Sequence, residues 1–196
     1  QQFEATLRAL DGSSDWRLLA FVFTLTDRVS HSFWRFHDPA AYAPIPPEEL
    51  AASRTRVEDA YRWVDAHLAS LLQRLPSDTT IFVLSDHGFQ ADPGSGHGTH
   101  RKEGIFLAAG PGIEPSATPI TLSVLDVTPT VLAGLGLPVG EDMDGAAQAS
   151  VFSELGNVRR IASYDATGAG APAPGKNAAK IDKTTEEQLR GLGYIE

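Results

Sequence analysis

The strongest constraint on the fold of this chain is a short apolar run that ends abruptly in polar, chemically active residues. The wholly apolar segment 81–84 is followed by Ser85, Asp86, His87 and Gly88. Short apolar runs bounded by turn residues are typical of buried strands in α/β proteins. Ligands of such proteins bind just beyond the carboxyl ends of the strands. Asp86 and His87 offer one oxygen and one nitrogen donor there, a combination that suits Zn²⁺, Mn²⁺ or Fe.

Two further pairs of residues have the same character. Asp27 and His31 are four residues apart, which places them on one face of a helical turn and allows both to bind one ion. His97 and His100 follow a segment rich in Gly, Pro and Ser. Three such clusters in a chain of 196 residues point to a metal-dependent hydrolase.

Two of these pairs also have a purely structural interpretation. Asp27 is compatible with a helix N-cap beside an unrelated surface histidine, and Asp86 with the cap of a turn at Gly88. Neighbouring residues of a regular strand point to opposite faces. Beyond the end of the strand, however, the backbone can turn Asp86 and His87 toward the same side.

The motifs occur in a specific order along the chain. They are TDRVSHSFW at 26–34, SDHGF at 85–89, GTHR at 98–101, GIF at 104–106, AGPGI at 109–113, DVTPTVL at 126–132, GLP at 136–138, DMDG at 142–145 and LRGLGYIE at 189–196. In this order they resemble the alkaline phosphatase superfamily, and within it the bacterial type I phosphodiesterase/nucleotide pyrophosphatase-like proteins. The resemblance runs from about residue 3 to residue 152 and returns at the C-terminus.

The resemblance implies a fold and a metal centre. The fold is an α/β three-layer sandwich with a mostly parallel central sheet, incomplete at its N-terminus. The cofactors are two divalent metal ions, Zn²⁺ foremost, with Mn or Fe as alternatives. By this resemblance Asp27, His31 and His100 hold one ion, and Asp86 and His87 contribute to the other.

The resemblance also bears on the segment 96–101. The last metal-binding histidine of the family lies in a Gly-x-His setting shortly before a strand, which Gly98-Thr99-His100 fits better than Gly96-His97 does. We therefore expect His100 to be the ligand. His97 and Arg101 would then flank the site and bind substrate.

One part of the family pattern has no counterpart here. Members carry a first metal-binding Asp and a Ser or Thr nucleophile near their N-terminus, and nothing before Asp27 matches that segment. We therefore expect the chain to be the C-terminal part of a longer enzyme, with the catalytic nucleophile upstream and the isolated chain inactive. The implied reaction is hydrolysis of phosphodiester or nucleotide pyrophosphate bonds through a covalent intermediate. A sulfatase of the same superfamily and a non-catalytic metal-binding fragment are the alternatives.

Composition narrows the classes of partner. The formal net charge of −9 (16 basic against 25 acidic residues) argues against a nucleic-acid-binding surface, so the expected partner is a small phosphate-ester or nucleotide-like substrate. No apolar run approaches the ~20 residues of a membrane span. The absence of cysteine excludes disulfides and thiolate ligands. Neither the compartment nor the oligomeric state follows from these features.

Hydrophobic spacing predicts the secondary structure and the domains. We expect helices at 3–10, 57–75 and 123–135, buried strands at 16–25, 79–84 and 104–109, and loops at 38–47 and 91–98. The catalytic domain part is expected at 1–155. A flexible Ala/Gly/Pro-rich segment follows at 156–183, and a short C-terminal helix and tail at 184–196.

Overall fold

The computed structural model describes residues 2–12 and 15–165 of the chain, which divide into two compact units. Within the described residues the first unit contains 2–12, 15–76 and 87–102, and the second contains 77–86 and 103–165. Most of the segment predicted to be flexible and the whole predicted C-terminal helix lie outside the described residues. The predicted division into three segments therefore stays a prediction.

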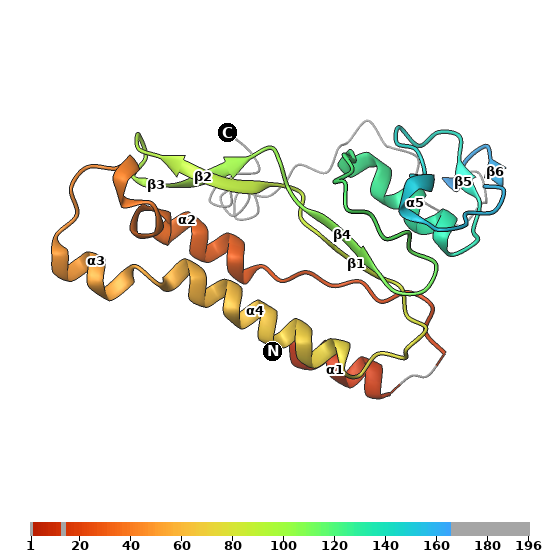
Figure 1. Cartoon of the computed structure of the whole chain (residues 1–196), viewed down its shortest axis with the longest axis horizontal. Coiled ribbons are helices and arrows are strands. Elements are labelled where there is room, and N and C mark those ends of the chain that lie inside the picture. The colour runs from red at the N-terminus through yellow and green to blue at the C-terminus, as the bar shows by residue number, and fades with distance from the viewer. Residues whose placement is uncertain (1, 13–14, 166–196) are drawn as a thin grey trace. The chain divides into compact units, whose positions relative to one another are not determined.

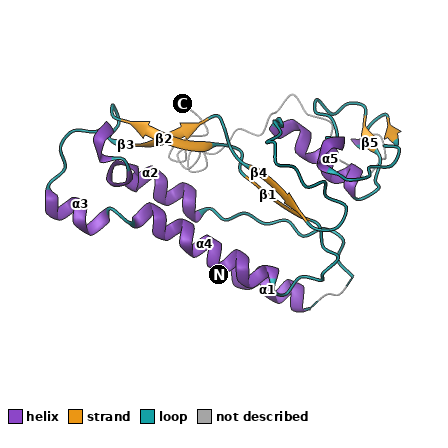
Figure 2. Cartoon of the chain, viewed as in Figure 1, coloured by secondary structure: helices purple, strands orange, loops and turns teal. Residues whose placement is uncertain are grey.

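The first unit consists of helices and one β-hairpin (Figures 1 and 2). Its elements are α1 (Gln2–Asp11), α2 (Leu25–His37), the 3₁₀ helix η1 (Pro39–Ala41), α3 (Pro47–Ser53), α4 (Arg56–Leu72), β2 (Gly88–Asp92) and β3 (His97–Arg101). Helix α2 packs against α4 on one side and against the β2–β3 hairpin on the other. It is therefore the central element of this unit.

Helices α1 and α4 form where the apolar spacing predicts them. Their apolar stripes meet in a core of Phe3, Leu7 and Leu71, because an amphipathic helix is stabilised chiefly by burying that stripe. Helix α3 was not predicted. It begins with Pro47 at its first position and carries two glutamates in its first turn, both of which favour a helix N-terminus.

The strand predicted at 16–25 is wrong. Residues 16–24 have no regular secondary structure, and Leu25 already belongs to α2. Phe21 and Phe23 pack on the apolar core, whereas Val22 between them is 64% exposed, so the side chains alternate as in an extended segment. No described strand pairs with this segment, and without a ladder of hydrogen bonds the apolar residues alone do not make a strand.

The loop predicted at 91–98 is correct for its central residues 93–96 and wrong at both ends, because residues 91–92 and 97–98 belong to the two strands of a hairpin. Strands β2 and β3 pair antiparallel, with Phe89 opposite His100 and Asp92 opposite His97. The four residues 93–96, Pro-Gly-Ser-Gly, form the turn, and Gly96 adopts a φ of +77° that favours glycine.

The second unit contains short strands and one helix. Its elements are β1 (Ile81–Leu84), β4 (Phe106–Ala109), η2 (Val124–Asp126), α5 (Val127–Gly134), β5 (Val139–Gly140), η3 (Ala149–Val151) and β6 (Arg160–Ile161). The strands predicted at 79–84 and 104–109 and the helix predicted at 123–135 are thus confirmed, with shorter bounds. The prediction that these strands are buried is wrong, because Leu84 is 42% exposed and Leu107 is 61% exposed.

The chain is α/β, as predicted. Its described strands form three two-stranded sheets: β1–β4 and β2–β3 are antiparallel, and β5–β6 is parallel. A three-layer sandwich around a mostly parallel sheet is not what these pairs show, and it stays a prediction. Among the described helices, none combines the length and the apolar character that crossing a membrane requires.

Candidate metal centre

Helix α2 supplies two donor groups from its first two turns. Asp27 and His31 lie four residues apart, and the Oδ1 atom of Asp27 is 3.6 Å from Nε2 of His31. One helical turn separates residues at this spacing, so their side chains project from the same face. The predicted shared face of Asp27 and His31 follows directly from this helix.

The hairpin supplies two more donor groups. His87 directly precedes β2, and His100 lies in β3 opposite Phe89. Alternation along a strand puts His87 and Phe89 on one face, and cross-strand neighbours share a face. That face lies against α2: His100 Nε2 is 3.5 Å, and His87 Nε2 3.9 Å, from Asp27 Oδ1.

A glycine allows the hairpin to approach the helix this closely. A β-carbon at Gly98 would lie 2.6 Å from the backbone oxygen of Ser30 and 2.7 Å from Cβ of Trp34. Ser30 itself is fully buried, at 0% exposure. Any larger residue at position 98 would therefore push β3 away from α2 and carry His100 with it.

The donor atoms fit a divalent metal ion. The Nε2 atoms of His31 and His100 are 3.0 Å apart, and each lies within 3.6 Å of Asp27 Oδ1. Ligands at 2.0–2.1 Å from a tetrahedral Zn²⁺ are about 3.3 Å from one another. One ligand atom from each of Asp27, His87 and His100 also lies within 4.8 Å of the others. We refer to Asp27, His31, His87 and His100 as the Asp–His cluster.

The carboxylate of this cluster has an unmet bonding requirement. Asp27 Oδ1 is buried and has no hydrogen-bond partner among the described residues. A buried polar atom without a partner costs free energy. A cation at the centre of the cluster would satisfy this oxygen, so the residues present fit a metal ion.

Two imidazoles are oriented by backbone carbonyl groups. Nδ1 of His31 lies 3.1 Å from the oxygen of Gly98, and Nδ1 of His87 lies 3.2 Å from the oxygen of Gly88. A carbonyl oxygen only accepts, so each Nδ1–H donates and each neutral ring keeps the lone pair on Nε2. Metal-binding histidines commonly have such a partner on the other ring nitrogen.

The surroundings of His100 favour its neutral form. Burial lowers the pKa of His100, and the nearby imidazoles of His87 and His31 lower it further, while Asp27 acts in the opposite direction. Only a neutral imidazole has a lone pair for a metal ion. His100 is therefore prepared to act as a ligand near neutral pH.

The remaining predicted site residues lie elsewhere. His97 and Arg101 alternate with His100 along β3 and are exposed, so they belong to the opposite face of the hairpin. Asp86 is the last residue of its segment of the second unit, directly before the chain enters the first unit at His87. Ligation by Asp86 and substrate binding by His97 and Arg101 remain predictions.

Sequence reasoning missed the residues that support the cluster. Phe89 and Gly98 lie in the motifs at 85–89 and 98–101, and Tyr42 lies in the predicted loop 38–47. The motifs do not themselves indicate that these residues support the donors. The Tyr42 hydroxyl donates to the oxygen of His97 and accepts from the backbone N–H of Asp92, which fixes the turn end of the hairpin. Strand alternation through 87–91 would have placed Phe89 beside the histidines.

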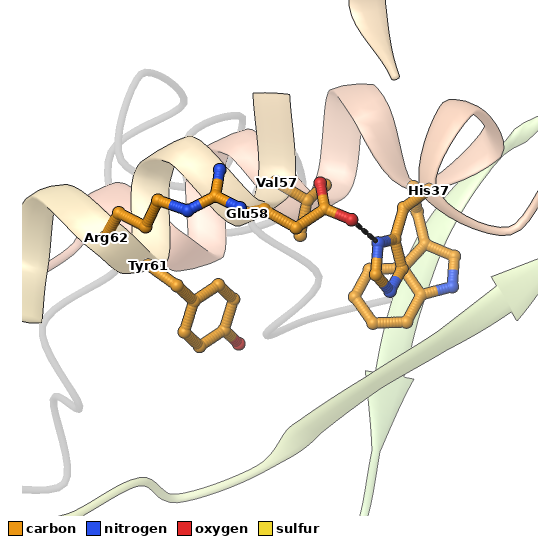
Figure 3. Close-up of a pocket in the computed structure, with 6 residues that line it drawn as sticks. His37, Val57, Glu58, Tyr61 and Arg62 are labelled. Atoms are coloured by element: carbon orange, nitrogen blue, oxygen red, sulfur yellow. Dashed lines mark hydrogen bonds and ion pairs between the residues drawn. The ribbon is translucent and has the colours of Figure 1, made fainter. Parts of the chain in front are cut away.

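A cavity of about 470 Å³ lies beside α2 and α4, outside the Asp–His cluster (Figure 3). It is lined by Trp34, His37, Val57, Glu58, Tyr61 and Arg62. Nδ1 of His37 and Oε1 of Glu58 are 2.9 Å apart, and Figure 3 marks this interaction with a dashed line. Arg62 pairs with Asp59. None of the cluster residues lines this cavity.

Comparison with known proteins gives one family. The family model described as type I phosphodiesterase / nucleotide pyrophosphatase matches residues 1–109, which include all four residues of the Asp–His cluster. No curated protein and no solved structure gives a significant match to the chain.

Proposed function

Because the chain belongs to the type I phosphodiesterase/nucleotide pyrophosphatase family, we propose that it takes part in metal-dependent hydrolysis of phosphate esters. The observation that carries this proposal is the Asp–His cluster. It combines a buried carboxylate oxygen without a hydrogen-bond partner with three imidazole Nε2 atoms 3.5–3.9 Å away. The family supports phosphate-ester hydrolysis at the level of the reaction class.

The finer proposal concerns two divalent ions. Asp27, His31 and His100 form the closest group of donors, and we assign them to one ion. His87 lies at the side of this group, and its ring stacks on that of His100 with centroids 3.7 Å apart. With Asp86 as its neighbour in the chain, His87 is assigned to the second ion. Mixed nitrogen and carboxylate donors favour Zn²⁺, with Mn or Fe as alternatives.

The cluster residues have distinct tasks in this proposal. Asp27 supplies a negative charge within 3.9 Å of the Nε2 atoms of all three imidazoles. The carbonyl groups of Gly98 and Gly88 hold His31 and His87 with Nε2 directed inward. Divalent ions bound there would supply the positive charge that stabilises a phosphoryl group during its transfer.

The proposed substrate is a small phosphodiester or nucleotide pyrophosphate. The proposed nucleophile is a Ser or Thr hydroxyl upstream of this chain, which forms a covalent phosphoryl intermediate before water completes the hydrolysis. Substrate contact by His97 and Arg101 is retained as a proposal, although both residues lie on the hairpin face opposite to His100, so only a substrate that extends around the edge of β3 would reach them. The three-layer sandwich is proposed for the complete catalytic domain.

The metal assignment is tested by zinc titration of the metal-free chain. We expect one tightly bound equivalent and a much weaker second one. His100→Ala should abolish the tight equivalent, and His97→Ala is the matched control that should leave it unchanged. Two equally tight equivalents, or loss of binding in the His97 variant alone, would contradict the assignment.

The reaction is tested on a longer protein that includes the upstream segment, with nitrophenyl phosphodiester and nitrophenyl sulfate as substrates. We expect hydrolysis of the diester, and its loss in Asp86→Ala without loss of folding. Hydrolysis of the sulfate alone would identify a sulfatase. Tight metal binding with neither activity would leave a non-catalytic metal-binding domain. Either result would overturn the proposed reaction.

A further inference from the structure

One phenyl ring touches three of the four residues of the Asp–His cluster. The Phe89 ring centroid lies 4.9 Å from that of His31, 5.4 Å from that of His100 and 5.6 Å from that of His87. The interplanar angles are 81°, 86° and 66°, so each imidazole meets the phenyl ring edge to face. This is a favoured arrangement for aromatic pairs.

The position of Phe89 is itself determined from two sides. Along the hairpin, Phe89 pairs directly with His100 and lies two residues from His87, so all three share one face. From the helix, Trp34 packs on Phe89 with centroids 5.6 Å apart. Trp34 lies three residues after His31 on α2. Contact with the Trp34 indole and with the imidazoles restricts the rotation of the Phe89 ring.

We propose that Phe89 is a positioning residue of the metal centre, holding the imidazoles of His31, His87 and His100 at the mutual angles needed for binding an ion. The proposal rests on the proposed metal-dependent function. The backbone carbonyl groups fix which nitrogen faces the ion in two of these rings, but a single hydrogen bond leaves a ring free to tilt about it. The Phe89 ring removes this tilt by contacting the rings themselves.

The shape of the side chain matters for this role. A flat ring presents a face to one partner and edges to others, whereas leucine offers no planar surface against which an imidazole can be oriented. Phe89→Leu retains apolar volume and removes the edge-to-face contacts. Phe89→Tyr retains the ring and is the conservative variant.

The test uses zinc affinity and the visible absorption spectrum of the Co²⁺-loaded chain, which reports ligand geometry. For Phe89→Leu we expect zinc binding weakened about tenfold or more, the range for residues that orient metal ligands, together with an altered cobalt spectrum. Phe89→Tyr should restore both. Trp34→Leu, which removes the support of Phe89, should shift both in the same direction by less.

A matched control separates positioning from general packing. Phe82 of β1 also packs against aromatic rings, those of Phe106 and Phe152, and it lies in the other unit. Phe82→Leu should lower the melting temperature and leave the cobalt spectrum unchanged. If Phe89→Leu is too unstable to study, the cobalt spectrum of Trp34→Leu decides: an altered spectrum supports the proposal, and an unaltered one overturns it.

The outcomes also distinguish the two proposals. If the unaltered chain binds neither Zn²⁺ nor Co²⁺, the metal-dependent function fails and this inference fails with it. If the unaltered chain binds tightly and Phe89→Leu has the same affinity and spectrum, only the positioning role of Phe89 is wrong.

Discussion

Helix α2 and the β2–β3 hairpin each contribute two side chains to the Asp–His cluster, but they hold them by different means. In α2 the spacing of Asp27 and His31 is a property of the helix itself, because backbone hydrogen bonds set one turn between them. In the hairpin, His100 lies in β3 and His87 is the residue directly before β2. Their separation depends on strand register, and their distance from α2 depends on the close contact at Gly98.

This difference has a practical consequence. A helix keeps its donors together as long as the helix persists, so α2 loses its contribution only when a donor is removed. The hairpin can lose its contribution while both histidines remain, if its register or its distance from α2 changes. Substitutions that displace the hairpin should therefore weaken metal binding without touching a ligand.

The largest effect is expected at Asp27, the α2 donor that lies close to the histidines of both elements. Asp27 Oδ1 lies within 3.9 Å of the Nε2 atoms of all three imidazoles, so Asp27→Asn should reduce zinc affinity by more than about a hundredfold, beyond the effect typical of supporting residues. The metal-free variant should remain folded, because Asn has nearly the size and shape of Asp, so a loss of zinc affinity would not reflect unfolding. Zinc titration measures the affinity, and thermal unfolding checks the fold. Asp59→Asn on α4 is the control, and zinc affinity retained in the Asp27 variant would contradict the cluster.

The second-largest effect tests whether displacement of the hairpin weakens metal binding when all four donor residues are still present. In Gly98→Ala the added β-carbon overlaps the backbone of Ser30 and the side chain of Trp34. We expect a loss of about 1–3 kcal/mol in the free energy of unfolding, as for other overpacked sites, and zinc binding weakened about tenfold or more.

The control for Gly98 lies in the same hairpin. A β-carbon at Gly94 would meet only a side-chain oxygen of Asp92, at an ordinary contact distance of 3.4 Å. Gly94→Ala should therefore leave zinc affinity unchanged. Equal effects of the two substitutions in the titration would show that the close contact at Gly98 does not set the position of His100.

The third effect concerns the turn end of the hairpin. Tyr42→Phe removes the hydroxyl that donates to His97 and accepts from Asp92. Chemical denaturation should show a loss of about 0.5–1.5 kcal/mol, with a smaller change in zinc affinity than Gly98→Ala causes, because the cluster lies at the other end of the strands. A change in zinc affinity as large as that of Gly98→Ala would mean that the turn controls the cluster.

The smallest effect depends on pH. Hydrogen bonding to Ser95 is the main cause that lowers the pKa of Asp92, and backbone N–H groups of Ser95 and Gly94 contribute further. A carboxyl group whose pKa is lowered by folding stabilises the fold above its unfolded pKa, and this contribution is lost as the pH falls through the folded pKa. Asp92→Ala should therefore lower the melting temperature near pH 7. The difference from the unaltered chain should begin to shrink below the unfolded carboxyl pKa of about 3.9 and disappear only below the lower folded pKa of Asp92. A difference that persists there would assign the effect to packing.

Several elements follow from local sequence because local forces make them. The apolar spacing in α1 and α4 predicts amphipathic helices with a buried apolar stripe. The apolar runs that end at Leu84 and Ala109 predict strands. Asp27 and His31 could be placed on one face for the same reason, since the helical repeat is set by neighbouring residues. The hairpin strands were not predicted in this way, because β3 contains no apolar side chain and β2 contains only Phe89 and Ala91, which is too few to indicate a half-buried strand.

The sequence by itself determined the donor types of the candidate metal centre, the α2 face and the apolar elements, because these depend on residue chemistry and short-range periodicity. Tertiary structure alone decided that His87 joins Asp27 and His100, and that Phe89 touches three imidazoles. It also decided that residues 16–24 find no strand partner within the described chain. These outcomes depend on pairing between distant segments, and such pairing is set by register and by the space left at Gly98, neither of which is encoded in a local window of sequence.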